Sequence, residues 1–222
     1  MAKRINIDEI LERKQRLFRR LPRWKQTSRR LLPIMDTLKY IAQRRGIEPK
    51  YRGEVMRYFP VAMVACIEGY FRLVVRDLVN AGHPFRERVA SLEKMEIGIE
   101  SLLAIADRQL TPGDIVSHFL PFNNLGDIQR NMSKLLECDF LNEVKTWKVA
   151  SGGKNPPIVL GKLQPPVVPL LERLYELRHI YCHELAVKRG VPSRKVADST
   201  RAGFLLTYAT EDYIREVHLP KK

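Results

Sequence analysis

The sequence predicts an all-α protein, an up-and-down helical bundle preceded by a basic helical extension. Apolar residues recur every three or four positions along several long segments, as one buried helix face requires. Proline or glycine lies at the ends of several of these segments, at Pro22, Gly46, Gly82, Pro84 and Gly190. Only one short stretch has the composition of paired strands. No internal repeat or sustained heptad pattern is present.

The N-terminal half predicts three helices. The first covers Asn6–Arg20, and the second runs from Ser28 to Arg45 and is closed by Gly46. The third, Arg52–Asn80, is the most apolar long stretch of the chain. Pro60 interrupts its pattern, so we expect a kink or a new helix there.

The C-terminal half predicts further helices. Residues Phe85–Leu110 are predicted to form one or two of these helices. Thr111 has the features of an N-cap for a short helix that ends near Leu120. Asn124–Glu137 and Ser199–Val217 show apolar faces at helical spacing. The stretch Leu171–Arg189 has the same pattern. Pro169, just before it, suits the first turn of this helix, and Gly190 follows its end.

Residues 142–165 differ from the rest, because prolines and glycines are frequent there. Trp147–Ala150 and Ile158–Leu160 flank a glycine-rich tip, so a short β-hairpin inserted into the helical domain is one interpretation. A plain loop is the other. The Ser-Gly-Gly-Lys sequence lacks the spacing of a phosphate-binding Walker loop.

The charge is uneven along the chain of 222 residues. The net charge is +14, and residues 1–58, with 17 basic and 6 acidic side chains, contribute +11 of it. We therefore divide the chain into a basic extension, residues 1–51, and a helical domain, residues 52–217. Such an excess indicates a polyanionic partner, most often nucleic acid. A basic surface kept for solubility, or one that binds an acidic protein, remains an alternative.

The basic side chains of the extension are concentrated within Arg13–Arg30, together with Phe18 and Trp24. Arginines among aromatic rings suit contact with phosphates and stacking on bases. The two aromatic residues fit equally well as core anchors of an amphipathic helix. The candidate nucleic-acid-binding residues are Arg16, Arg19, Arg20, Arg23, Lys25, Arg29 and Arg30.

Other features bear on compartment and cofactors. Three widely spaced cysteines indicate reduced thiols rather than a disulfide framework. The charged N-terminus does not have the pattern of a signal peptide, and no apolar run suggests a membrane span. We expect a cytoplasmic protein without a membrane partner, metal or cofactor.

Arg178, His179 and His183 bring a strong cation and two imidazoles within six positions of one predicted helix. On an ideal helix Arg178 and His183 lie about 140° apart, so one helix does not direct both at one phosphate. Two copies of the helix across a symmetry axis would bring both residues of both chains around one cleft. The spacing therefore makes a homodimer part of the hypothesis.

Three stretches resemble the HEPN superfamily, in particular its RiboL-PSP type. Arg178–His183 matches the superfamily's R-polar-x3-H motif, with His179 at the polar position. Cys66–Leu73 and Pro121–Gln129 are similar to other parts of such domains, and the resemblance covers about residues 52–217. It implies a HEPN-type bundle that cleaves RNA as a homodimer without metal, using the RNA's own 2′-OH as nucleophile.

The resemblance also implies roles for single residues. His183 is the general acid or base, and Arg178 stabilises charge on the phosphoryl oxygens. His179 replaces the Asn or Asp frequent at that position, so the division of roles between the two histidines stays open. Glu68 and Arg72 line the cleft or form an i,i+4 salt bridge. The implied setting is a toxin, phage-defence or stress-response system, with an acidic antitoxin as a further partner.

The same residues also have structural interpretations. Arg178 can pair with a neighbouring glutamate on a solvated helix face, and the two histidines can form a surface pair or half of a zinc site. The alternative function is a non-catalytic helical module that binds nucleic acid or docks an antitoxin, with a degenerate R-x4-H site.

Overall fold

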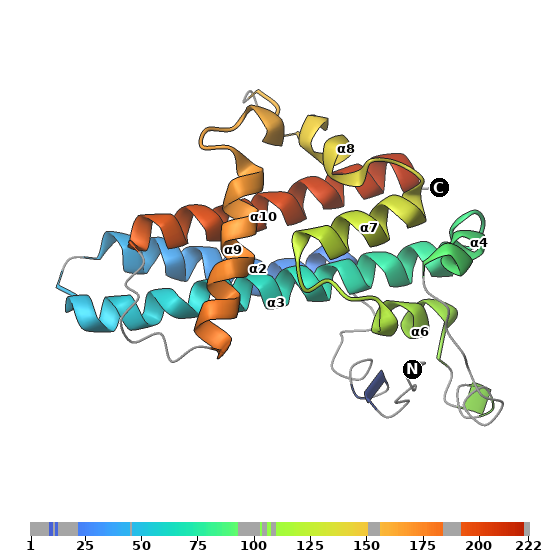
Figure 1. Cartoon of the computed structure of the whole chain (residues 1–222), viewed down its shortest axis with the longest axis horizontal. Helices are drawn as coiled ribbons and strands as arrows, with labels where there is room; N and C mark the ends of the chain where they lie inside the picture. The colour runs from blue at the N-terminus through green and yellow to red at the C-terminus, as the bar shows by residue number, and fades with distance from the viewer. Residues whose placement is uncertain are drawn as a thin grey trace.

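The computed structural model describes residues 22–44, 46–92, 110–150, 156–183 and 192–219, and in addition residues 9, 10, 12, 103, 106 and 107. These described residues form a bundle of eight α-helices and contain no β-strand, so the predicted all-α class is confirmed (Figure 1). Short 3-10 turns at Val89–Ser91 and Leu160–Lys162 and a π-helical turn at Ile214–His218 complete the elements. The α-helices are α2 Arg23–Gln43, α3 Pro49–Ala81, α4 Phe85–Arg88, α6 Pro112–Phe119, α7 Leu125–Leu136, α8 Phe140–Thr146, α9 Val167–His183 and α10 Ser193–Tyr213.

Helix α3 is the centre of the bundle. It contacts α2, α6, α9 and α10, and α9 crosses in front of it in Figure 1. Its 33 residues extend about 50 Å. Contrary to the sequence-based expectation, α3 is long and apolar enough to span a membrane, judged by length and composition alone. Most of its most apolar segment is buried inside the bundle, as in the core helix of a globular domain.

Side-chain caps fix where two of the shorter helices begin. Thr111 accepts a hydrogen bond from the amide of Asp114, and the Asp114 carboxylate accepts one from the Thr111 amide, which forms a capping box. Asn124 caps α7 by accepting from the amide of Asp127 at 2.7 Å. Both starts agree with the sequence-based predictions.

Two boundaries suggested by the sequence lie within helix α3. Helix α3 continues through Pro60, so no new helix begins there. Phe59 and Pro60 are both buried, and packing on both sides stabilises the helix where proline removes a backbone hydrogen bond. Helix α3 also begins at Pro49, so the boundary proposed at residue 51 falls within a helix rather than in a linker.

Helix α2 belongs to the same core as the rest of the bundle. Leu31 is fully buried in the central apolar cluster, and Trp24 packs against that cluster and against Tyr208, with ring centroids 5.6 Å apart. The interpretation of Trp24 as a core anchor is therefore confirmed, whereas Phe18 lies outside the described residues. The described part of the basic segment therefore contributes a helix, α2, to the core of the bundle.

The proposed β-hairpin is reduced to a single antiparallel bridge between Val149 and Ile158, and the described residues around it form no strand. Each of these two residues donates its amide to the other's carbonyl at 2.9 Å. Pro156 and Pro157 follow the tip and have no N–H to extend a ladder. The tip itself, residues 151–155, lies outside the described residues.

A buried ion-pair network joins three helices. Arg23 of α2 donates to Glu211 of α10 at 2.7 Å and to Asp77 of α3 at 2.9 Å. The Tyr70 hydroxyl donates to the same Glu211 carboxylate at 3.1 Å. Burial by itself lowers the pKa of Arg23, but Tyr70, Glu211 and Asp77 together more than offset it, so its pKa is raised. Burial and the Glu211 charge also raise the pKa of the Tyr70 hydroxyl. Arg23 is therefore held as a cation inside the bundle.

Gly203 permits the close approach of α10 to α3 and α9. A Cβ atom at this position would lie 2.7 Å from Cγ of Met63 and 2.8 Å from Cδ2 of Leu174. We expect Gly203→Ala to lower the free energy of unfolding by about 1–3 kcal/mol, because the core must shift to admit the methyl group. Urea unfolding measures the effect. Gly53→Ala, a site in α3 with no atom within 4 Å of the added methyl, is the control and is expected to be neutral or stabilising. Equal stability of the two variants would contradict this packing.

Candidate functional site

Helix α9 carries the R-x4-H motif and is anchored by its apolar face. Leu174 and Leu177 are completely buried, and Leu171 and Ile180 are nearly so. The helix begins at Val167, a few residues earlier than predicted, and its described part ends at His183. The predicted end near Arg189 lies outside the described residues. The buried leucines fix which way the intervening polar side chains point.

Arg178 lies where α9 crosses α3, and its guanidinium approaches the Glu68 carboxylate of α3 at 3.5 Å. The two side chains are 29% and 20% exposed, so solvent reaches both. One turn earlier on α9, Tyr175 is buried. Burial raises the pKa of its phenol, and the Glu68 charge raises it further. Glu68 of α3 therefore lies close to two side chains of α9, Arg178 and Tyr175.

The two motif histidines are described to different extents. His179 is exposed next to Arg178. For His183 the structure describes only the backbone, at the end of α9. Within the described part of the chain, no group of three or more His, Cys, Asp or Glu side chains is arranged to hold a metal ion. The described cysteines, Cys66, Cys138 and Cys182, are free thiols.

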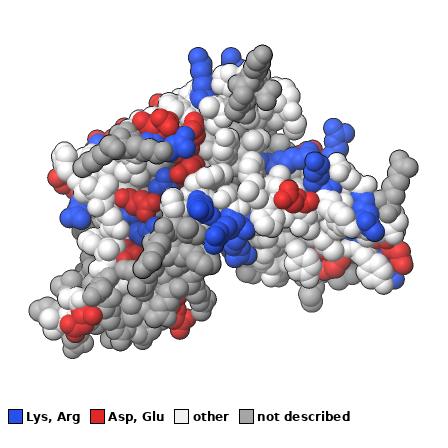
Figure 2. Space-filling view, turned by 180° about the vertical axis from the view of Figure 1, so that it is seen from behind, with Lys and Arg blue, Asp and Glu red and all other residues white. Residues whose placement is uncertain are grey.

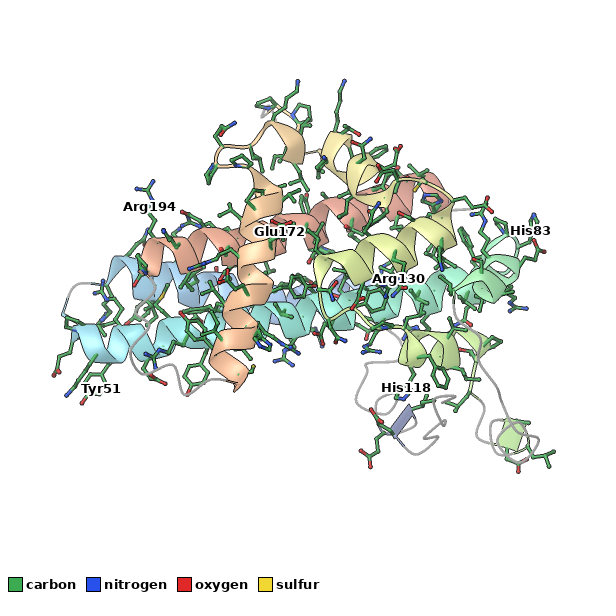
Figure 3. All side chains as sticks on the ribbon, viewed as in Figure 1. Tyr51, His83, His118, Arg130, Glu172 and Arg194 are labelled. Atoms are coloured by element: carbon green, nitrogen blue, oxygen red, sulfur yellow. The ribbon has the colours of Figure 1, made fainter. Side chains whose placement is uncertain are left out.

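Glu68 and Arg72 also line a pocket of about 300 Å³ between α3 and α6. Arg72 donates to the backbone carbonyls of Ser117 and His118 at 3.0 and 3.1 Å, at the end of α6. His118, labelled in Figure 3, lies on α6 at the opposite side of this pocket from α3. Both residues therefore border a cavity, as the cleft interpretation expects, and Glu68 joins the cavity to Arg178.

Arg76 is a pocket residue that the sequence reasoning did not select. It lines the same cavity one turn after Arg72, and its guanidinium donates to Asp77 at 2.9 Å. The four-residue spacing between Arg72 and Arg76 was the available signal, since such a spacing places both on one helix face. The pocket wall therefore carries two guanidinium groups from α3.

The candidate nucleic-acid-binding residues divide into three groups. Arg16, Arg19 and Arg20 lie outside the described residues. Arg23 is only 7% exposed and is bonded to Glu211 and Asp77, so its assignment to a nucleic-acid surface is wrong. Lys25, Arg29 and Arg30 are exposed on α2. Figure 2 shows Lys and Arg side chains across the middle and right of the rear face, with fewer acidic side chains among them.

Comparisons of the chain with protein-family models, with curated proteins and with solved structures give no match.

Proposed function

We propose that this protein cleaves RNA as a metal-independent endonuclease, with Arg178, His179 and His183 as its reacting side chains. The observation that carries the proposal is the placement of Arg178. A carboxylate from α3 orients its guanidinium, the side chain stays 29% exposed, and the neighbouring His179 is exposed as well. A planar guanidinium reached by solvent is suited to binding two phosphoryl oxygens at once.

The proposed reaction is an internal transfer within the RNA. The 2′-oxygen of one nucleotide attacks the adjacent phosphorus, and the bond to the 5′-oxygen of the next nucleotide breaks. One imidazole accepts the 2′-OH proton and another donates a proton to the leaving oxygen. Arg178 stabilises the negative charge on the non-bridging oxygens. The products are a 2′,3′-cyclic phosphate and a free 5′-hydroxyl.

A homodimer is part of the proposal, because Arg178 and His183 lie about 140° apart around one helix. Two motif helices would place the arginine of one chain near the histidine of the other. The expected setting is the cytoplasm, in a toxin, defence or stress-response system with an acidic antitoxin. Sedimentation velocity at micromolar concentration tests the dimer, and a monomer that cleaves RNA would refute the shared cleft.

The direct test is cleavage of single-stranded RNA in excess EDTA. The proposal expects products with 2′,3′-cyclic phosphate ends and no cleavage of a strand in which every 2′-OH is replaced by hydrogen. Arg178→Ala purified in the same way controls for contaminating nuclease. Activity that EDTA abolishes, or cleavage of the 2′-deoxy strand, would rule out this mechanism.

A second candidate function is nucleic-acid binding without catalysis, or docking of an acidic antitoxin. It is favoured by the Glu68 carboxylate, which already pairs with Arg178 in the absence of a phosphate. The exposed Lys25, Arg29 and Arg30 would supply charge for such binding.

Neutralising these three residues together as glutamines tests the binding surface. We expect the slope of log affinity for single-stranded RNA against log salt to fall by about 2, because each lost phosphate contact removes about 0.7. Filter binding at several salt concentrations measures the slope. The control is the triple variant Arg130→Gln, Lys134→Gln, Arg215→Gln, which removes the same charge from exposed positions on other elements. An equal change in slope for both triple variants would show that RNA affinity depends on net charge and not on the position of Lys25, Arg29 and Arg30.

A further inference from the structure

Three tyrosines extend into solvent near the end of the bundle where α2 joins α3. Tyr40, Tyr51 and Tyr58 are 54%, 57% and 63% exposed. The other five tyrosines of the chain are buried or half-buried. In Figure 3, Tyr51 lies at the tip of this end and points away from the bundle. Exposed aromatic residues at one end of a bundle are available to a partner rather than used in packing the core.

Two of these rings lie on one line along α3. Tyr51 and Tyr58 are seven residues apart, which on an ideal helix is a rotation of about 20° and a rise of about 10 Å. Val55, between them on the same line, is 37% exposed. Helix α3 therefore presents an apolar stripe of two rings to solvent.

Cations lie beside two of the three rings. The Lys50 ammonium lies 4.6 Å from the centroid of the Tyr51 ring, and the Arg44 guanidinium lies 5.3 Å from that of Tyr40. Residues 39–58 contain six basic and two acidic side chains. The two carboxylates are each bonded to a cation, Glu48 to Lys50 at 3.4 Å and Glu54 to Arg57 at 3.1 Å. The exposed rings thus lie in a region of net positive charge.

We propose that this tyrosine surface, made of Tyr40, Tyr51 and Tyr58 with Arg44 and Lys50, binds single-stranded RNA by stacking unpaired bases on the rings. Aromatic platforms among cations are the arrangement that single-stranded nucleic acids bind, because every base has a π-face and every linkage a negative charge. A duplex hides its base faces and suits the surface less well. An apolar protein partner would gain nothing from the six cations. The choice of RNA as the ligand rests on the proposed ribonuclease function, and this inference adds that the bound RNA is unpaired.

The surface is placed to direct a strand toward Arg178. Glu68, which holds Arg178, follows Tyr58 by ten residues, about 15 Å along α3. Ala65 and Gly69, both exposed, continue the same side of the helix toward the pocket. Tyr181 of α9 packs against the apolar cluster that contains Met56 and Phe59, so α9 lies beside this part of α3. A strand stacked on Tyr51 and Tyr58 would therefore run toward the motif helix.

The test uses a fluorescent uridine 12-mer in which every 2′-OH is methylated, so that the strand cannot be cleaved by 2′-OH attack. Fluorescence anisotropy gives its affinity for the full-length protein. Tyr51→Ala with Tyr58→Ala is expected to weaken binding about 25-fold, about fivefold for each lost ring. Tyr51→Phe with Tyr58→Phe keeps the rings and is expected to bind within about twofold of the wild-type protein. Val217→Ala, at another exposed apolar position, is the control and should have no effect.

Three outcomes would overturn the inference. These are unchanged affinity in the alanine pair, equal loss in the phenylalanine pair, or a duplex that binds as tightly as the single strand. An alanine pair that loses its dimeric state in sedimentation and keeps its affinity would identify the surface as an interface between copies, which also overturns it. Circular dichroism confirms that each variant is folded. Failure of the ribonuclease proposal gives a different pattern, in which the probe binds through the tyrosines but unmodified RNA stays intact.

Discussion

Replacing Arg23 by methionine is expected to lower the free energy of unfolding by about 3–5 kcal/mol, because Glu211 would then be left without its cation. Glu211 is 9% exposed and receives hydrogen bonds from Arg23 and Tyr70. The methionine fills most of the space, so the effect measures electrostatics more than packing. Urea unfolding, followed by circular dichroism, gives the change from the midpoint and slope.

Two further variants separate the network from a general effect of losing arginine. Arg194→Met removes a guanidinium that is 93% exposed and 3.9 Å from Asp198, and it is expected to cost less than about 1 kcal/mol. Adding Glu211→Gln to Arg23→Met should recover much of the loss, since the amide oxygen still accepts from Tyr70 and carries no charge. If Arg23→Met is as stable as Arg194→Met, the buried pair does not stabilise the bundle.

Replacing Arg178 by alanine is expected to reduce RNA cleavage at least about a hundredfold, the usual cost of removing one donor that stabilises a developing oxyanion. His183→Ala is expected to cost about 100- to 10,000-fold if its imidazole transfers a proton. Arg178→Lys should recover little, because an ammonium cannot form the two parallel hydrogen bonds of a guanidinium. Initial rates of cleavage of a labelled single-stranded RNA measure all three.

Arg173→Ala is the matched control, because this arginine is on the same helix and is bonded to Glu176 at 3.0 Å. It should cleave at the wild-type rate. All the α9 variants should retain their helical content, which circular dichroism measures. Wild-type cleavage by Arg178→Ala or by His183→Ala would remove that residue from the site.

Apolar periodicity was sufficient to predict the fold class, because helical spacing is local information. Thr111 and Asn124 marked the starts of α6 and α7 for the same reason, since a cap acts on an amide three residues away. The sequence left a kink or a new helix open at Pro60, and no new helix begins there. The burial of Phe59 and Pro60 depends on the tertiary structure, which a local pattern does not contain. The hairpin was one interpretation of the flanking residues, and the described residues on either side of its tip form a single bridge.

The candidate site was predicted less completely, because ion pairs between helices are not visible in a local pattern. Arg23 was grouped with its basic neighbours, but its partners are Asp77 and Glu211, far along the chain. Glu68 was assigned either to a cleft or to a salt bridge with Arg72, and the structure adds a contact with Arg178, 110 positions away. Charge counting likewise placed a domain boundary at residue 51, which lies within α3.

The order of the helices has a consequence for synthesis of the chain. Helix α3 is made early, but α10, which covers part of its apolar surface, is completed only at Tyr213. During translation, α3 therefore remains incompletely covered for more than half of the chain's length. A nascent chain in this state exposes an apolar helix long enough to span a membrane, and such exposed apolar surface favours aggregation until the last helix packs on it.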